Sequence, residues 1–169
     1  MSQLRLDPLN GRWSVISEER RERPLAFQPR WLPVEADPRP CPFCGDGDGD
    51  DLPPSLELGD ASGWQVRVVP NRYPAFEGNV PMAVTNLGPI FTQAPGSGIH
   101  EVLLLRPEHQ GSWADLNDAR SALVMRAVAA RMTAHAVLPG LRYSQAIVNA
   151  GREAGASIEH PHGLSLIHI

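Results

Sequence analysis

The chain has 169 residues and a formal net charge of −4, from 15 Lys and Arg against 19 Asp and Glu. This length favours one domain, and no apolar run approaches the length of about 20 residues that a helix needs to cross a bilayer. Residues 1–11 lack the basic-then-apolar order of a signal peptide, and the acidic charge disfavours binding to nucleic acid. We therefore expect a cytoplasmic protein that binds neither a membrane nor nucleic acid.

The first half of the chain predicts two strands separated by a long loop. Residues Arg12–Ile16 alternate weakly between polar and apolar and predict the first strand. Residues 28–63 are rich in Pro and then in Gly and Asp, which predicts a loop region. Residues Trp64–Val69 predict the second strand. Residues 75–98 predict irregular structure, with a candidate short strand at Met82–Thr85.

One long helix is predicted in the second half, after an apolar and therefore central strand at His100–Leu105. Ser112 is the predicted N-cap, and Asp115 is its capping-box partner. Small and apolar residues then recur every three or four positions and predict the buried face. They are Leu116, Ala119, Leu123, Ala127, Ala130 and Ala134.

The helix is predicted to end at Leu138–Gly140, and two more strands are predicted after it. These are Tyr143–Asn149 and the segment from Ile158 onward, with a glycine-bearing loop between them. Strands that alternate with irregular connections and one long crossing helix predict an α+β fold with a mostly antiparallel sheet.

Two cysteines, Cys41 and Cys44, flank a Pro-Phe dipeptide. A disulfide that closes so small a loop would stabilise the chain little. A redox pair normally begins a helix, whereas Pro40 precedes this pair and a Gly- and Asp-rich run follows it. The tight turn favours a metal site with two thiolate ligands, with a redox dithiol and inert thiols as the alternatives. A metal site would need two further ligands from elsewhere in the chain.

Two histidines, His160 and His162, stand two residues apart. On a strand such residues share a face, so they could point into one site, although a pair of solvated histidines fits the same pattern. The glycine-rich loop upstream, residues 149–157, could bring backbone N–H groups close to an anion. Arg20 and Arg23 could bind phosphate oxygens, or could belong to a solvated charged segment.

Taken together, these motifs resemble the galactose-1-phosphate uridylyltransferase family, a branch of the histidine-triad superfamily. The resemblance lies in blocks that occur in the family's order through residues 6–163. The blocks are Leu6-Asp7-Pro8, Gly11-Arg12-Trp13, Arg20 with Arg23-Pro24, Cys41-Pro42-Phe43-Cys44, Val69-Pro70-Asn71-Arg72-Tyr73-Pro74, Gly98-Ile99-His100-Glu101-Val102, Pro107-Glu108-His109, and Asn149, Gly151 and Gly155-Ala156-Ser157 with His160-Pro161-His162-Gly163.

The resemblance implies a role for each matching residue. His162 matches the catalytic nucleophile. The ligands of a structural zinc ion are matched by Cys41, Cys44, His109 and His160. Positions that hold the nucleotide and its phosphates are matched by Arg20, Arg23, Asn71, Arg72, Asn149, Gly155 and Ser157.

The implied activity is ping-pong transfer of UMP from UDP-glucose to galactose 1-phosphate through a uridylyl-histidine, as part of galactose metabolism. The resemblance further implies a zinc cofactor and a homodimer in the full-length protein. The alternatives are an adenylyl-sugar or dinucleotide phosphorylase of the same superfamily, and a non-catalytic zinc-binding module.

The sequence departs from the family's pattern at its end. Leu164 stands where family members usually have Gln, and residues 164–169 do not match the family's pattern. We therefore expect residues 1–163 to be the N-terminal half of a longer transferase, and we expect the tail not to be native sequence.

Overall fold

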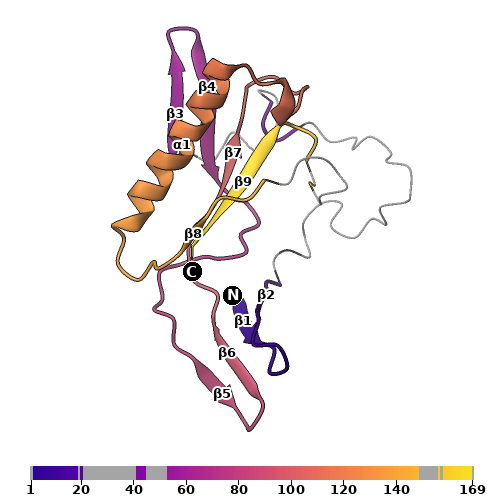
Figure 1. Cartoon of the computed structure of the whole chain (residues 1–169), viewed down its shortest axis with the longest axis vertical. Coiled ribbons are helices and arrows are strands. Elements are labelled where there is room, and N and C mark those ends of the chain that lie inside the picture. The colour runs from indigo at the N-terminus through magenta and orange to yellow at the C-terminus, as the bar shows by residue number, and fades with distance from the viewer. Residues whose placement is uncertain are drawn as a thin grey trace, which may run out of the picture.

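The computed structural model describes residues 2–18, 20, 41–44, 53–148, 156 and 158–168, and for residues 164–168 it describes the backbone alone. The described residues form two antiparallel sheets, and one long helix packs across a face of the larger sheet (Figure 1). This arrangement confirms the predicted α+β fold. No helix in the described part of the chain is long and apolar enough to cross a membrane.

The smaller sheet has four strands in the order β2-β1-β6-β5, and every neighbouring pair is antiparallel. Its strands are β1 (Gln3–Leu6), β2 (Trp13–Ile16), β5 (Thr85–Leu87) and β6 (Phe91–Pro95). The hairpin of β5 and β6 projects away from the helix-covered sheet (Figure 1). Leu4 and Ala94 pair across the sheet and are buried against Ala75 and Phe76, which follow β4.

The larger sheet has five strands in the order β3-β4-β7-β9-β8, again with antiparallel neighbours. Its strands are β3 (Leu56–Asp60), β4 (Gly63–Pro70), β7 (His100–Leu104), β8 (Ser144–Gln145) and β9 (His162–His168). All five residues of β7 are buried, as expected for a central strand. The apolar run that predicted this strand therefore lies in the middle of the sheet.

The side chains of β7 alternate between two environments. Leu103 is buried in the cluster beneath the helix, as is Leu105 directly after the strand. Val102 and Leu104 face the other way and pack with Phe43 from the cysteine turn. Successive residues of a strand point to opposite faces. The same strand therefore supplies side chains both to the core under the helix and to the opposite face of the sheet.

Helix α1 runs Asp118–Ala136 and begins later than the sequence predicts. The capping box of Ser112 and Asp115 does form, but it caps a short 3₁₀ turn, Trp113–Asp115. Leu116 is then extended, with φ −75° and ψ 130°, and it separates the turn from the helix. The true N-cap is Asn117, whose side chain accepts a hydrogen bond from the Arg120 N–H.

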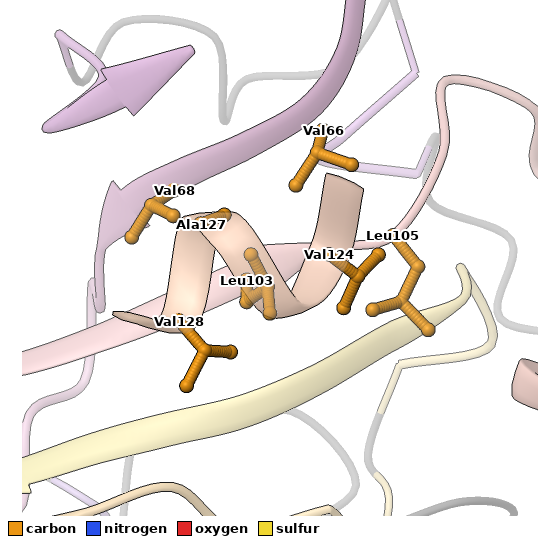
Figure 2. Packing of buried hydrophobic residues seen from close by; sticks show 7 residues of the cluster. All are labelled: Val66, Val68, Leu103, Leu105, Val124, Ala127 and Val128. Atoms are coloured by element: carbon orange, nitrogen blue, oxygen red, sulfur yellow. The ribbon is translucent and has the colours of Figure 1, made fainter. Parts of the chain in front are cut away.

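The predicted buried face of the helix is also partly wrong. Ala119, Ala130 and Ala134 are exposed. The buried face instead carries Val124, Ala127, Val128 and His135. Figure 2 shows three of these residues, Val124, Ala127 and Val128, packed against Val66, Val68, Leu103 and Leu105 of the sheet. Alanines recur around this whole helix, so their spacing is compatible with more than one face, and the branched side chains decide which face packs.

Other expected elements differ in extent. Residues 28–63 were predicted to be loop, yet β3 lies within them. Residues 75–98 were predicted to be irregular, yet they hold β5 and β6, and the candidate strand at Met82–Thr85 gives way to Thr85–Leu87. In the last part of the chain, β8 has only two residues, and β9 begins at His162 rather than at Ile158. Short strands without an apolar run are stabilised by the strands they pair with, so they are hard to predict from local sequence.

A buried polar cluster joins the helix to the centre of the sheet. Glu101 of β7 is 2% exposed and accepts two hydrogen bonds from Arg131, of 2.8 and 3.0 Å. His135, 1% exposed, places its Nε2 atom 3.0 Å from the Arg131 guanidinium. The same Nε2 atom lies 3.3 Å from the Glu101 carboxylate, so the His135 ring contacts both members of the pair.

The lowered pKa of His135 predicts how stability depends on pH. Burial lowers the pKa of His135; Glu101 opposes this effect and Arg131 adds to it. As the pH falls below the unfolded value of about 6.5, the unfolded chain binds a proton that the folded chain does not bind. Stability should therefore fall by up to about 1.4 kcal/mol per pH unit in this window. Urea unfolding at pH 7.5 and 5.5 measures the loss, and an equal loss in His135→Gln would contradict it.

Candidate active site and metal centre

Four potential metal ligands from three distant segments meet at one end of the larger sheet. Cys41 and Cys44 lie in a tight turn, in which the Cys44 N–H donates to the Cys41 carbonyl over 3.2 Å. The Phe43 N–H points at the Cys41 sulfur, 3.4 Å away. His109 follows the end of β7, and His160 lies two residues before the start of β9. The long-range pairing of β7 with β9 therefore brings the two histidines to the same place.

The spacing of these four residues fits a single tetrahedral ion. Their ligand atoms all lie within 4.8 Å of one another. The Cys44 sulfur is 3.2 Å from Nδ1 of His109 and 3.5 Å from Nδ1 of His160, and the Cys41 sulfur is 3.7 Å from the latter atom. A tetrahedral zinc ion with ordinary bond lengths separates its sulfur and nitrogen ligands by about 3.5 Å. The residues predicted as ligands are thus grouped as a metal site requires, and they could hold a metal ion.

His160 is oriented as a metal ligand should be. Its side chain is fully buried, and its Nε2 atom lies 2.9 Å from the Arg106 carbonyl oxygen. Since a carbonyl only accepts, Nε2 carries the proton and Nδ1 presents its lone pair to the two sulfurs. Burial lowers the pKa of His160, which keeps the ring neutral, as metal ligation needs.

His162 is half-buried and is the first residue of β9, where it pairs with Leu104. Directly paired residues project to the same face of a sheet, so His162 lies on the face that carries Val102 and Leu104, opposite the helix. His160 precedes β9, so the two histidines are not neighbours on one strand face as the sequence suggested. They are linked differently: Nδ1 of His162 lies 2.8 Å from the carbonyl oxygen of His160.

Asn71 and Arg72 directly follow β4. Asn71 is half-buried and Arg72 is exposed. The Asn71 N–H donates to the His100 carbonyl over 2.8 Å, which extends the pairing of β4 and β7 by one step. The Asn71 Oδ1 atom accepts from the Tyr73 N–H over 2.8 Å, so the side chain caps its own turn.

The remaining predicted nucleotide-binding residues are described less fully. Arg20 is half-buried, and burial lowers its pKa from the usual arginine value. Four others lie outside the described residues, namely Arg23, Asn149, Gly155 and Ser157.

The sequence alone assigns no role to two features of this region. The first is the carbonyl of Arg106, which orients His160, and a backbone atom leaves no trace in sequence. The second is His100, whose imidazole contacts the turn after β4. His100 lies within a block that resembles the family, and a polar residue at the start of an apolar run was the available signal.

Comparisons with known proteins agree on one family. The family model described as galactose-1-phosphate uridyl transferase, N-terminal domain, matches residues 1–168. An ADP-glucose phosphorylase from Arabidopsis thaliana is 31% identical, over 95% of this chain and 46% of the relative. A galactose-1-phosphate uridylyltransferase from Streptomyces lividans is 30% identical, over 96% of this chain and 36% of the relative.

Solved structures give the same result. A uridylyltransferase structure is 26% identical with a TM-score of 0.64, and the match covers 98% of this chain and 45% of that chain. An Arabidopsis thaliana ADP-glucose phosphorylase with bound ADP-glucose is 25% identical with a TM-score of 0.63, over all of this chain and 49% of that chain. The chain spans less than half the length of each of these four relatives.

Proposed function

We propose, given that this chain belongs to the galactose-1-phosphate uridyl transferase family, that it transfers UMP from UDP-glucose to galactose 1-phosphate through a uridylyl-histidine at His162. The observation that carries this proposal is the contact of 2.8 Å between Nδ1 of His162 and the carbonyl oxygen of His160. A carbonyl oxygen can only accept a hydrogen bond, so Nδ1 of His162 must carry the ring proton. The other ring nitrogen, Nε2, then holds a lone pair directed away from the backbone. A neutral imidazole of fixed tautomer is a suitable nucleophile near pH 7.

In the first half-reaction, Nε2 of His162 attacks the α-phosphorus of UDP-glucose. The new N–P bond replaces the bond from phosphorus to the bridging oxygen, and glucose 1-phosphate leaves with that electron pair. The imidazole becomes positively charged as the bond forms, and the His160 carbonyl stabilises this charge through the Nδ1 proton. In the second half-reaction, a phosphate oxygen of galactose 1-phosphate attacks the same phosphorus and restores the free histidine.

The other predicted residues would bind the substrate. Asn71 and Arg72 stand at the end of β4, and we assign them to the nucleotide and its phosphates. The same role falls to Arg20, Arg23, Asn149, Gly155 and Ser157. Forked guanidinium donors and backbone N–H groups offset charge on the transferring phosphoryl group.

We assign a structural zinc ion to Cys41, Cys44, His109 and His160, because two thiolates and two imidazoles favour zinc. When bound, the ion would cross-link the cysteine turn to the residues before β9. The chain's own contribution is His160, which uses its ring as a ligand and its carbonyl to hold His162. We further place the full-length protein in the cytoplasm as a homodimer, consistent with its family.

Adenylyl transfer is the second candidate, because relatives named ADP-glucose phosphorylase match this chain as well as uridylyltransferases do. In that reaction the same histidine would accept AMP from ADP-glucose. The histidine geometry is common to both reactions, so the nucleotide base decides between them.

Mass spectrometry of the intact protein tests both candidates. After exposure to UDP-glucose, the chain should gain the mass of one uridylyl group, whereas a gain of one adenylyl group from ADP-glucose would favour the second candidate. His162→Ala should lose the adduct entirely, and His168→Ala, a histidine variant on the same strand, should keep it. An adduct that persists in His162→Ala would refute the nucleophile. Retention of zinc with no adduct from either sugar nucleotide would favour a non-catalytic zinc module.

A further inference from the structure

The indole ring of Trp113 packs against Gly163, the residue that directly follows His162. A methyl group placed on Gly163 would lie 3.4 Å from Cζ3 and 3.7 Å from Cε3 of this ring, and 3.5 Å from Cδ2 of Leu105. Gly163 is buried, and Trp113 is half-buried against the cluster beneath the helix. The ring therefore covers the backbone of β9 with no side chain between them.

The start of β9 has few other supports. His162 and Gly163 both pair with residues of β7. The next pair in this ladder skips residue 164, so β9 bulges immediately after Gly163. On its other edge, β9 pairs with β8 only at residues 167 and 168. In the part of the chain that the structure describes, His162 therefore lies on a short paired stretch that has a strand on one side only.

Trp113 and His162 lie on opposite faces of the sheet. Gly163 pairs with Leu103, which is buried beneath the helix, whereas His162 pairs with Leu104, which faces away from it. Because directly paired residues project to the same face, Trp113 lies behind the strand from which His162 projects. Trp113 can therefore affect His162 only through the backbone of β9.

The turn that carries Trp113 is fixed by its own hydrogen bonds. The Ser112 hydroxyl accepts from the Ala114 N–H over 3.2 Å, and the Asp115 carboxylate accepts from the Ser112 N–H over 2.6 Å. The Leu116 N–H donates to the Trp113 carbonyl over 3.3 Å and closes the 3₁₀ turn. A side chain on a turn held in this way gives the strand a fixed surface to pack against.

The orientation of the His162 ring depends on the backbone that Trp113 supports. Its Nδ1 atom lies 2.8 Å from the carbonyl oxygen of His160, two residues earlier in the chain. A shift of residues 160–163 would therefore move the ring and free it from this contact. A misplacement of about 1 Å can slow a reaction roughly 100-fold.

We propose that Trp113 is a positioning residue, which packs behind Gly163 and so holds His162 in the orientation that attacks phosphorus. This inference rests on the proposed function, in which His162 is the nucleophile. Trp113 acts through the backbone of Gly163 and contacts neither the substrate nor the reacting atoms.

Trp113→Leu tests the proposal, because leucine keeps an apolar side chain in the core and lacks the ring that reaches Gly163. Rapid quenching followed by mass spectrometry gives the rate of adduct formation at increasing UDP-glucose or ADP-glucose. We expect the maximum rate to fall roughly tenfold. The half-saturating concentration of the sugar nucleotide should change less than about twofold, since Trp113 makes no contact with it. Trp113→Phe, which keeps an aromatic ring, should regain most of the lost rate.

Leu123→Ala is the matched control for a merely structural effect. Leu123 is also partly buried against the cluster beneath the helix, but the atoms nearest to a methyl group on Gly163 belong to Trp113 and Leu105. This variant should have a lower melting temperature, yet each folded molecule should form the adduct at the parent's rate. If Trp113→Leu likewise keeps the parent's maximum rate per folded molecule, the proposal is overturned.

NMR of the parent chain decides the matter if Trp113→Leu does not fold. The ring protons of Trp113 should show nuclear Overhauser contacts to the α-protons of Gly163, and nitrogen NMR should show His162 protonated on Nδ1. Missing contacts, or a ring proton on Nε2, would overturn the proposal. A parent chain that forms no adduct with either sugar nucleotide refutes the proposed function instead, and this inference with it.

Discussion

Replacing Cys44 with Ser should reduce bound zinc from one equivalent per chain to nearly none and should unfold much of the chain near the site. Cys44 is the ligand candidate that contacts both histidines, at 3.2 and 3.5 Å. A structural zinc site contributes about 10–16 kcal/mol of binding free energy in small zinc-dependent peptides, and the folded state needs all four ligands to gain it. The expected loss of stability is therefore among the largest that any single substitution in this chain can cause.

Metal analysis of the purified protein and its thermal unfolding curve measure this effect. A chelator should reproduce the lower melting temperature in the unsubstituted chain and should change the Cys44→Ser variant little. The matched control is Glu108→Gln, an exposed carboxylate beside His109 that is not part of the ligand set. This control should keep a full equivalent of zinc. A full equivalent of zinc in Cys44→Ser would show that the four residues are not the ligands.

Replacing Arg131 with Met should destabilise the chain by about 3–5 kcal/mol, because it leaves the Glu101 carboxylate buried without its cation. Glu101 is 2% exposed and is held by both ends of the Arg131 guanidinium fork. Urea unfolding measures the change. Arg126→Met is the matched control, since Arg126 lies on the exposed side of the same helix. It should change the free energy of unfolding by less than about 0.5 kcal/mol.

A second variant separates the buried charge from the packing. Glu101→Leu combined with Arg131→Met replaces both partners by apolar groups, and it should recover most of the lost stability. If Arg131→Met alone unfolds at the same urea concentration as the parent chain, then water or a protonated His135, 3.3 Å from the carboxylate, compensates Glu101. The pair of Arg131 and Glu101 is then not the link between helix and sheet that its burial indicates.

Local sequence patterns predict only part of the metal-ligand set. The spacing of Cys41 and Cys44 indicates a turn with two thiolates, and that much follows from residue types alone. His109 and His160 are 51 positions apart in sequence and meet because β7 pairs with β9. Residue patterns do not encode which strands pair, so the complete set came from the family resemblance.

The helix start and the site geometry show why other details could not be predicted. Ser112 and Asp115 form the expected capping box, but the extended backbone of Leu116 interrupts the helix, and no propensity signals that. The hydrogen bond from His162 to the His160 carbonyl depends on β9 beginning at His162, which its neighbours in the sheet determine. Glu101 was a signal that sequence reasoning could have used, because a single charge within an apolar strand needs a buried partner.

The alternation along β7 has a consequence for a mutational library of this protein. Positions 101, 103 and 105 contact the helix side, and positions 100, 102 and 104 face the side of the histidines and the cysteine turn. A library that varies only the first set should select variants by expression and heat tolerance, while the yield of the proposed histidine adduct per folded molecule stays nearly constant. A library of the second set should change stability and adduct yield together, because His100, Val102 and Leu104 are also buried and lie on the face of His162. Positions that affect stability alone therefore alternate, residue by residue, with positions that affect both properties along one six-residue segment.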